Sequence, residues 1–476
     1  MIMLIGREYE KKQLLGLLDK NESQFCAVYG RRRVGKTFLI RETFNRNFCF
    51  QHTGMANSPT DRQLAEFKES LINYGLENVK TPKTWSEAFR MLGQLIDRCS
   101  DKKKVIFLDE ISWLDTPKSG FLSALEHFWN GWATARIQQD IVLIVCGSAT
   151  SWIINNIVKN HGGLHNRLTR QIYLKPFSLY ECEKLCSVSG LDFSRKDILE
   201  IYMIMGGIPY YWNFLERQLS VSQNIDKIFF SESAPLRTEF ENLYSSIFRK
   251  PEPYITVIKA LGSQTCGLTR KKILEITKLN DNTQFTRVLD DLEQCSFIRR
   301  YNSYLKKSKD SVYQLIDNYT LFYFKFICEN RNMDENYFTT SIDSQVRTVW
   351  TALAFERVCL GHIAQIKKTL GISGVSTAVN SWFTLATDLY DGAQIDLLID
   401  RNDNTINICE IKYYDDEFVI DKQYEASLRR KMSTFKLATK TKKSVFLTLI
   451  ASAGLRVNKY SSIVNSVITA DDLFCE

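Results

Sequence analysis

The most informative segment of the chain is Gly30-Arg31-Arg32-Arg33-Val34-Gly35-Lys36-Thr37. It matches the pattern G-x-x-x-x-G-K-[ST], in which the glycines let backbone N–H groups curl around phosphate oxygens. The apolar run 25–29 before it predicts a strand, and residues 38–44 after it predict a helix. A strand, a glycine-rich loop and a helix in this order predict a phosphate-binding loop at the edge of an α/β sheet.

The side chains of this loop predict the cofactors. Lys36 would place a positive charge at the β- and γ-phosphates of ATP, and the hydroxyl of Thr37 would bind Mg²⁺. ATP and Mg²⁺ are therefore the expected cofactors. The rest of the predicted nucleotide-binding segment consists of Gly30, Arg31, Arg32, Arg33, Val34, Gly35 and Phe38.

A second apolar run, 105–108, ends in the carboxylates Asp109 and Glu110. Two acids after a buried strand form a Walker B pattern, which predicts that Asp109 holds Mg²⁺ through water and that Glu110 polarises the attacking water as a general base. Ser148 follows the next strand-like run, 141–146, where a polar group would contact the γ-phosphate. The alternative for Ser148 is an ordinary turn residue.

Two arginines lie further along the chain, Arg167 and Arg170. We favour Arg167 as the residue that stabilises charge on the γ-phosphate, with Arg170 as the second candidate. Either could act within its own chain or across the interface of a homo-oligomer. The competing interpretation is that both are surface arginines.

The pattern of predicted elements divides the chain into four parts. Strands and helices alternate over residues 1–180, which predicts a parallel sheet with helices on both faces. Helical stretches dominate residues 181–250 and predict a lid, with helices expected over 179–188, 195–205, 209–218 and 234–249. Residues 251–315 show helices followed by a hairpin, the order of a winged helix-turn-helix. Residues 316–476 return to an α/β pattern. The predicted fold class is therefore α/β, with a parallel sheet, a helical lid, a winged helix-turn-helix and a second α/β domain.

Several of these segments together resemble one family. The loop 30–37, the pair Asp109-Glu110, the triplet 146–148 and the stretch Gly206-Gly207-Ile208-Pro209 resemble the archaeal-type AAA+/STAND ATPases of bacteria and archaea. The opening stretch 5–8 is also typical. The resemblance extends over residues 1–315 and implies ATP binding and hydrolysis, a helical lid and a nucleotide-driven switch.

The last part of the chain carries a second set of acids. Asp396 lies in one strand-like run, and Glu410 and Lys412 lie two apart in the next, so that these two share one face of a strand. Two carboxylates and a lysine on adjacent strands can hold Mg²⁺ and activate a water for phosphodiester cleavage. Glu356, on a preceding helical stretch, could add a third carboxylate.

This set resembles the PD-(D/E)xK nuclease superfamily, the restriction-endonuclease-like fold. The resemblance implies that Asp396 and Glu410 are metal ligands, that Lys412 positions the nucleophile or offsets charge, and that Glu356 is the acid on the helix. It also implies an accessory polar role for Gln423. Active cleavage and a domain that only binds nucleic acid or protein both remain open.

The charge balance favours DNA as a partner. The chain of 476 residues has a formal net charge of +8, of which +5 falls between residues 250 and 310, with twelve basic against seven acidic residues. Lys306, Lys307 and Lys309 in the predicted wing suit contacts with phosphates. Protein docking by the winged helix, and an ATP-regulated transcription factor, are the alternatives.

Cysteine usage and hydropathy indicate the compartment. The twelve cysteines have no repeated spacing, and several, such as Cys26, Cys146 and Cys409, lie inside apolar runs. This predicts reduced, buried thiols and no disulfide framework. Since no apolar run approaches the ~20 residues of a membrane-spanning helix and the first residues lack the features of a signal peptide, we expect a cytoplasmic protein with no membrane partner.

Overall fold

The computed structural model describes residues 4–476 apart from a few short gaps, and the chain divides into two compact units. The residues outside the description are 161, 265–266, 303, 306–310, 329, 331–333 and 343. The first unit comprises residues 1–176, 241–251 and 289–295, and the second comprises residues 177–240, 252–288 and 296–476.

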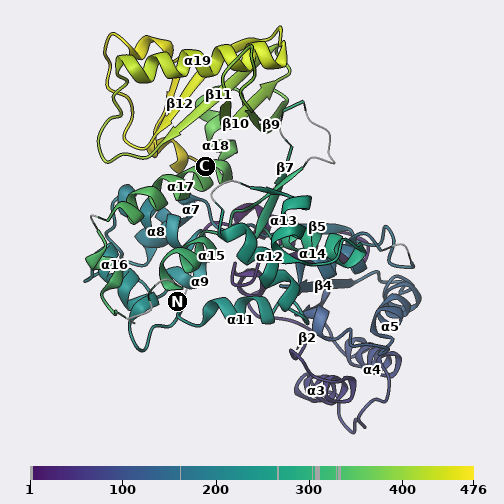
Figure 1. Ribbon diagram of the computed structural model, residues 1–476. Coiled ribbons are helices and arrows are strands. Elements are labelled where there is room, and N and C mark those ends of the chain that lie inside the picture. The colour runs from purple at the N-terminus through teal and green to yellow at the C-terminus, as the bar shows by residue number, and fades with distance from the viewer. Residues whose placement is uncertain are drawn as a thin grey trace. The chain divides into compact units, whose positions relative to one another are not determined.

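A parallel five-stranded sheet forms the centre of the first unit, in the order β2-β3-β4-β1-β5 (Figure 1). Its strands are β1 (Gln24–Tyr29), β2 (Phe50–Thr53), β3 (Lys104–Asp109), β4 (Ile141–Gly147) and β5 (Arg170–Tyr173). Every residue of β3 and β4 is buried because helices cover both faces of a parallel sheet. The predicted parallel sheet is thus confirmed. The sequence did not predict β2 and β5, which have only four residues each.

Short helices connect and cover these strands. They are α1 (Glu8–Leu15), α2 (Lys36–Thr43), α3 (Thr60–Asn73), α4 (Trp85–Asp97), α5 (Phe121–Phe128) and α6 (Thr150–Ile153), with the single turns η1 (Ile111–Trp113), η2 (Trp129–Ala133) and η3 (Ile154–Val158). In the core beside them, the ring of Trp85 packs edge-on against Phe67 and Phe121 with centroids 5.5 and 4.9 Å away. Such aromatic pairs fix how α3, α4 and α5 pack together.

The second unit begins with the helices expected of a lid. α7 (Leu179–Val188) and α8 (Arg195–Met205) have the predicted bounds, because Ser178 and Ser194 each form a capping box at their start. The predicted helix 209–218 is shorter, since α9 (Pro209–Trp212) ends after one turn. The predicted helix 234–249 contains only α11 (Glu239–Ser245). The elements α10 (Val221–Ile225) and η4 (Asp226–Phe230) lie between them.

The stretch Gly206-Gly207 ends α8 for steric reasons. Gly206 has a φ of +62°, a left-handed conformation that side chains disfavour. A Cβ on Gly207 would lie 1.8 Å from the carbonyl oxygen of Phe177, and Phe177 N–H donates to the Gly207 carbonyl over 2.6 Å. Only glycine allows the two backbone segments to approach this closely.

Helices and a small sheet form the segment 251–315, for which the sequence predicts a winged helix. The helices are α12 (Glu252–Gly262), α13 (Arg270–Thr277) and α14 (Thr283–Gln294), and the antiparallel strands β6 (Leu268–Thr269), β7 (Ile298–Tyr301) and β8 (Val312–Leu315) lie in the order β6-β8-β7. α14 is shared by the two units, because its residues from 289 onward group with the parallel sheet. The predicted wing lysines Lys306, Lys307 and Lys309 lie outside the described residues.

A mixed five-stranded sheet forms the C-terminal part, in the order β13-β12-β11-β10-β9. Its strands are β9 (Thr377–Thr384), β10 (Ala393–Arg401), β11 (Thr405–Lys412), β12 (Ser444–Ala451) and β13 (Ser466–Ile468). β9, β10 and β11 are antiparallel, whereas β12 and β13 continue from β11 in parallel. The helix α19 (Lys422–Thr439) lies along this sheet (Figure 1, yellow) and packs Leu428 and Phe435 into its apolar core.

Further helices precede and follow this sheet. They are α15 (Asn318–Phe322), η6 (Tyr323–Ile327), α16 (Tyr337–Thr340), α17 (Gln345–Gly361), α18 (Ile363–Thr369), η7 (Ser461–Ile463) and η8 (Asp471–Phe474). Among the described residues, the search for a helix both long and apolar enough to cross a membrane finds none.

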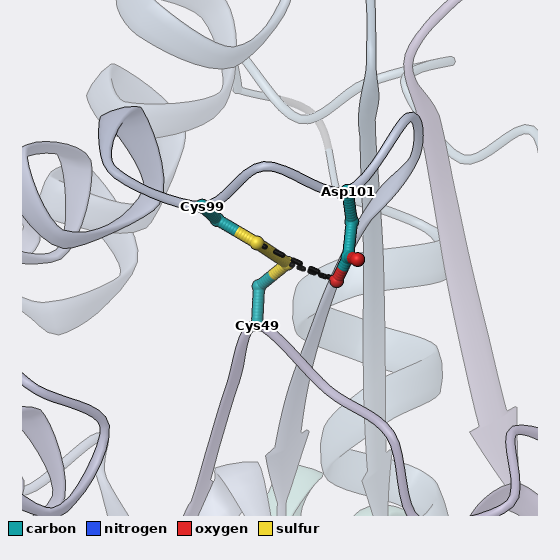
Figure 2. A group of neighbouring side chains, drawn as sticks. All are labelled: Cys49, Cys99 and Asp101. Carbon is teal, nitrogen blue, oxygen red and sulfur yellow. Dashed lines mark hydrogen bonds between the residues drawn. A yellow bond between two sulfur atoms is a disulfide. The ribbon is translucent and has the colours of Figure 1, made fainter.

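A disulfide links Cys49, directly before the edge strand β2, to Cys99, two residues after α4. Cys49 and Cys99 are bonded, and an oxygen of Asp101 lies 3.4 Å and 3.5 Å from their sulfurs (Figure 2). The prediction of reduced thiols is therefore wrong for this pair. Their separation of 50 residues carries no signal in the sequence. α4 returns the chain to the amino end of β3, where Cys49 N–H already donates to the Val105 carbonyl over 2.9 Å.

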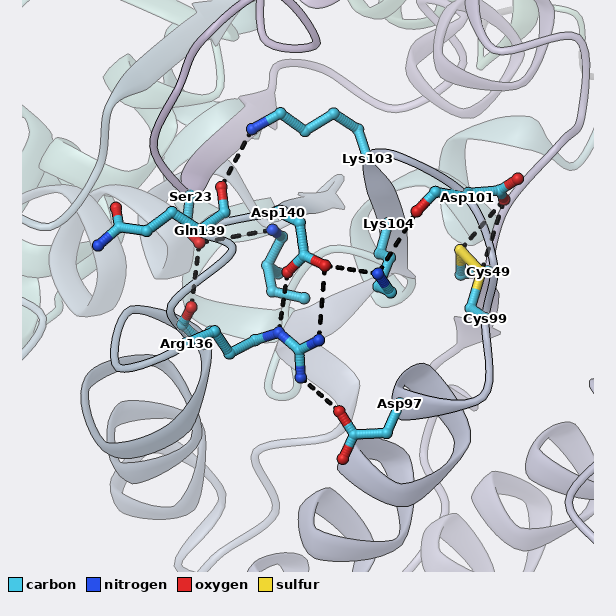
Figure 3. A network of polar contacts seen from close by, with 12 residues as sticks. Ser23, Cys49, Asp97, Cys99, Asp101, Lys103, Lys104, Arg136, Gln139 and Asp140 are labelled. Carbon is cyan, nitrogen blue, oxygen red and sulfur yellow. Dashed lines mark hydrogen bonds and ion pairs between the residues drawn. A yellow bond between two sulfur atoms is a disulfide. The ribbon is translucent and has the colours of Figure 1, made fainter.

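An ion-pair network near the disulfide joins residues at the amino ends of β3 and β4 (Figure 3). The buried carboxylate of Asp140 accepts from Lys104 Nζ over 2.5 Å and from Arg136 Nε over 2.8 Å, and Arg136 also pairs with Asp97. Although burial raises the pKa of Asp140, its bonds to Arg136 and Lys104 outweigh burial and lower it. The network keeps the amino ends of β3 and β4 together.

Removing the disulfide is expected to destabilise the first unit. Because the bond closes a loop of 50 residues, the double substitution Cys49→Ser/Cys99→Ser should lower the free energy of unfolding by up to about 4 kcal/mol. Thermal melts with and without a thiol reductant measure this effect. Cys328→Ser, at an exposed free cysteine, is the control and should leave the midpoint unchanged. Equal melting of wild type in both conditions contradicts the expectation.

Candidate functional site

The phosphate-binding loop connects β1 to α2 and has the conformation that its glycines require. Gly30 has a φ of +147°, and a Cβ there would lie 2.2 Å from the carbonyl oxygen of Leu174. Gly35, directly before α2, has a φ of +92° and open space where a Cβ would be. The first glycine is thus required by close packing, and the second by its left-handed backbone.

Lys36 lies buried inside this loop. Its ammonium group donates to the carbonyl oxygens of Gly30 over 2.9 Å and Arg31 over 3.0 Å. Burial lowers the pKa of Lys36, and the nearby Glu110 and Asp109 oppose this effect. The side-chain nitrogen of Lys36 therefore lies at the centre of the loop, bonded to two of the loop's own carbonyl oxygens.

The remaining loop residues surround this charge. Arg31 and Val34 are buried, while Arg32, Arg33, Thr37 and Phe38 are partly exposed. Arg33 has a φ of +69°, which turns the backbone between the two glycines. The predicted segment is thus a single compact loop.

A hydroxyl and a carboxylate meet beside Lys36. Thr37 Oγ1 donates to Asp109 Oδ2 over 2.9 Å, which joins the start of α2 to the end of β3. Asp109 Oδ1 accepts from the thiol of Cys146 over 2.7 Å. Burial and the charge of Asp109 raise the pKa of the Cys146 thiol, so it stays protonated and donates. Thr37 and Asp109 offer the oxygen ligands that suit Mg²⁺.

The predicted base and the predicted phosphate sensor contact each other. Glu110 Oε2 accepts from the Ser148 N–H over 3.1 Å and from the Ser148 hydroxyl over 2.9 Å. β1 and β4 end side by side, with Tyr29 paired to Gly147, so that the loop and Ser148 leave the sheet at the same edge. The structure therefore brings together Lys36, Thr37, Asp109, Glu110 and Ser148.

The two candidate arginines lie near the amino ends of the strands, whereas the phosphate-binding loop follows the carboxyl end of β1. Arg170 is the first residue of β5 and pairs with Cys26, three residues before the end of β1. The N–H of Thr169 bonds to the Phe25 carbonyl, which places Arg167 before the amino end of the same strand. Within one chain, the structure brings neither arginine to the phosphate-binding loop. A role across a subunit interface stays a prediction.

In the C-terminal sheet, Asp396 and Glu410 lie on neighbouring strands. β10 and β11 pair from Leu397 with Cys409 to Asp400 with Ile406, so that Asp396 and Glu410 each lie one residue beyond the last paired positions. Lys412 Nζ lies 3.1 Å from Glu410 Oε1, as expected for residues two apart on one strand face. Glu356 lies on α17, and its neighbour Arg357 forms an ion pair with it.

Side chains that sequence analysis missed occupy this site. Glu410 Oε1 accepts from the Tyr424 hydroxyl over 2.6 Å, and Glu410 Oε2 pairs with Lys431 Nζ at 2.6 Å. Tyr424 and Lys431 are seven residues apart on α19 and share one helix face, which is the signal that would have found them. The predicted accessory residue Gln423 is exposed.

The pKa values of Glu356 and Glu410 shift in opposite directions. Burial raises the pKa of Glu356. Burial also acts to raise the pKa of Glu410, but Lys431, Lys412 and the hydroxyl of Tyr424 outweigh it and lower the pKa. Across the described residues, the oxygens of Glu356, Asp396 and Glu410 do not form a group within 4.8 Å of one another.

Comparison with known proteins gives one family model that matches the first part of the chain. Residues 4–214 match the family model described as an ATPase domain predominantly from Archaea. This part of the chain is therefore similar to P-loop ATPase domains. The match covers the phosphate-binding loop, Asp109, Glu110 and Ser148, and it implies that the domain binds a nucleotide.

Several relatives match a larger share of the chain. An uncharacterized protein of Methanocaldococcus jannaschii is 25% identical over 434 residues, which cover 87% of this chain and 88% of that protein. A Walker-type ATPase of Pyrococcus abyssi covers 67% of this chain and 95% of its own, with 17% identity and a TM-score of 0.47. The ORC2 protein of Aeropyrum pernix covers 72% and 96%, with 14% identity and a TM-score of 0.44. Since both TM-scores are below 0.5, neither solved structure bears on function.

Alanine at the two loop glycines should have unequal effects. Gly35→Ala introduces only a left-handed alanine and should cost about 1–2 kcal/mol of stability. Gly30→Ala adds a clash with the backbone of Leu174 and should cost more, with loss of nucleotide binding. Urea unfolding and nucleotide titration of both variants measure this order. Equal stability of the two variants contradicts the close approach at Gly30.

Proposed function

We propose that the protein is an ATP-hydrolysing switch that binds DNA. The contact between Thr37 and Asp109, next to the buried Lys36, supports the first part of this proposal most directly. A positive charge, a hydroxyl and two carboxylates converge at the carboxyl edge of one parallel sheet. That combination suits a nucleoside triphosphate with Mg²⁺.

Each residue would have a separate task in hydrolysis. Lys36 would bind the β- and γ-phosphates, while Thr37 and Asp109 would hold Mg²⁺, which when bound neutralises charge on the phosphates. Glu110 would accept a proton from the attacking water, after Ser148 turns from Glu110 toward the γ-phosphate. The hydrogen bond between Ser148 and Glu110 keeps the base in place until a nucleotide arrives.

The helix α14 would transmit the state of the nucleotide site. Its last turn groups with the ATPase sheet, whereas its first residues group with the winged helix. Within the first unit, the sulfur of Cys295, directly after α14, accepts from the backbone N–H groups of Ser151 and Thr150, two and three residues after Ser148. A movement of Ser148 would therefore reach α14 through a short segment.

ATP turnover tests the first part of the proposal. Lys36→Ala should abolish nucleotide binding, whereas Glu110→Gln should keep binding and slow Mg²⁺-dependent hydrolysis by on the order of 10²–10⁴-fold. Phosphate release and nucleotide titration measure the two effects. The matched controls Lys80→Ala and Glu77→Gln, at exposed sites of the same unit, should behave as wild type. Equal turnover in all five proteins would refute the ATPase assignment.

The winged helix supports DNA as the partner. Lys271, Lys272, Lys278 and Arg287 are exposed, and of these only Lys271 has an ion pair among the described contacts, to Glu275 at 4.0 Å. Exposed basic residues on a winged helix suit the phosphates of a duplex. For the C-terminal sheet, cleavage and binding without cleavage were both open. The ion pairs at Glu356 and Glu410 favour binding without cleavage.

DNA binding is expected to depend on salt and on these residues. Lys272→Ala and Arg287→Ala should each weaken duplex binding and lower the slope of log affinity against log salt by about one. Fluorescence anisotropy over a salt series measures this, with Lys80→Ala as the control. Incubating wild type with linear, supercoiled and single-stranded DNA plus Mg²⁺ or Mn²⁺ tests cleavage. Cleavage that is lost in Lys412→Ala would restore the nuclease interpretation.

A further inference from the structure

The carboxylate that would hold a metal in the C-terminal sheet is surrounded by cations. Glu410 is mostly buried, and its two oxygens accept from Lys431 and the Tyr424 hydroxyl over 2.6 Å each and form an ion pair with Lys412 at 3.1 Å. The ammonium group of Lys412 also lies 5.3 Å from the centre of the Tyr424 ring. A metal ion at Glu410 would have to displace at least one ammonium group.

The other two acids of the set are engaged as well. Asp396 Oδ1 accepts from Gln394 Nε2 over 2.6 Å, and Glu356 is paired with Arg357. Counting Lys412, Lys431 and Arg357 against three carboxylates leaves the set neutral before any further cation is added. The donors are thus arranged to neutralise the carboxylates, which is not the arrangement that Mg²⁺ requires.

The winged helix adds a fourth cation to this set. Arg299, on β7, lies close enough to Glu356 and Asp396 for their charges to act on it, and burial lowers its pKa to about 10. Tyr304, after β7, donates its backbone N–H to the Ser381 carbonyl of β9 over 2.8 Å and packs its ring against Phe435 of α19. The winged-helix strand and the C-terminal sheet therefore pack together around a set of charged groups that has one more cation than carboxylates.

We propose that Lys412 and Lys431, held apart by Glu410, form a phosphate-binding site that contacts the nucleic-acid backbone without a divalent cation. Lys431 takes the place at Glu410 that a metal would need, and Tyr424 fixes the carboxylate between the two lysines. A phosphate oxygen would draw both ammonium groups away from Glu410. This assignment rests on the DNA binding proposed above and names the side chains that carry part of it.

Replacing Glu410 by glutamine distinguishes a phosphate site from a metal site, because the two sites predict opposite changes in duplex affinity. If the lysines bind phosphate, Glu410→Gln removes a competitor and should tighten duplex binding by about three- to fivefold. Lys431→Ala should weaken binding and lower the salt slope by about one. Wild type should bind equally in EDTA and in Mg²⁺. Anisotropy titrations in both buffers measure these affinities, and thermal melts confirm that the variants fold.

Two matched variants control for net charge. Glu425→Gln removes a carboxylate of α19 that pairs with Arg429, and Lys436→Ala removes an exposed lysine on another face of the helix. Each should change affinity less than its counterpart. Binding that requires Mg²⁺, or that weakens in Glu410→Gln, would overturn the phosphate site while leaving DNA binding intact. No binding by wild type in any buffer would refute the proposed DNA binding and, with it, this assignment.

Discussion

The arrangement of the ATPase domain depends on one buried charge, the ammonium group of Lys36. A lysine this deeply buried is costly unless its hydrogen bonds are satisfied, and the carbonyls of Gly30 and Arg31 satisfy them. Those carbonyls can turn inward only because Gly30 accepts a backbone conformation and a packing distance that exclude a Cβ. The loop, the end of β3 and the end of β4 then meet at one sheet edge.

The two acid-bearing sites of the chain differ in how their charges are balanced. In the ATPase domain, Asp109 accepts from a hydroxyl and a thiol, both neutral groups that leave its negative charge available to a cation. In the C-terminal sheet, Glu410 accepts from two ammonium groups, which neutralise it. Carboxylates near the ends of two strands are thus balanced by neutral donors in one place and by ammonium groups in the other.

Local patterns predicted the parts of the fold that depend on short-range physics. The bounds of α7 and α8 were predicted from helix-compatible stretches, and serine caps fix their starts in the structure. The strands β3 and β4 were predicted from continuous apolar runs. The elements that were missed are short or irregular. β2 has only four residues, and the disulfide beside it joins two cysteines that are 50 residues apart. Of the long helix predicted at 234–249, only the seven residues of α11 are helical. The boundary between the two compact units falls within α11.

The phosphate-binding loop after a strand could be found from the order of the amino acids, because glycine spacing and apolar runs are local properties of the chain. The sequence also placed Asp109, Glu110 and Ser148 at strand ends, where parallel pairing must bring them together. The fold was needed to show that Arg167 and Arg170 lie near the amino ends of the strands, because strand direction and register set their positions. It also decided that Lys431 reaches Glu410, since a helix approaches a sheet through packing that no single segment encodes.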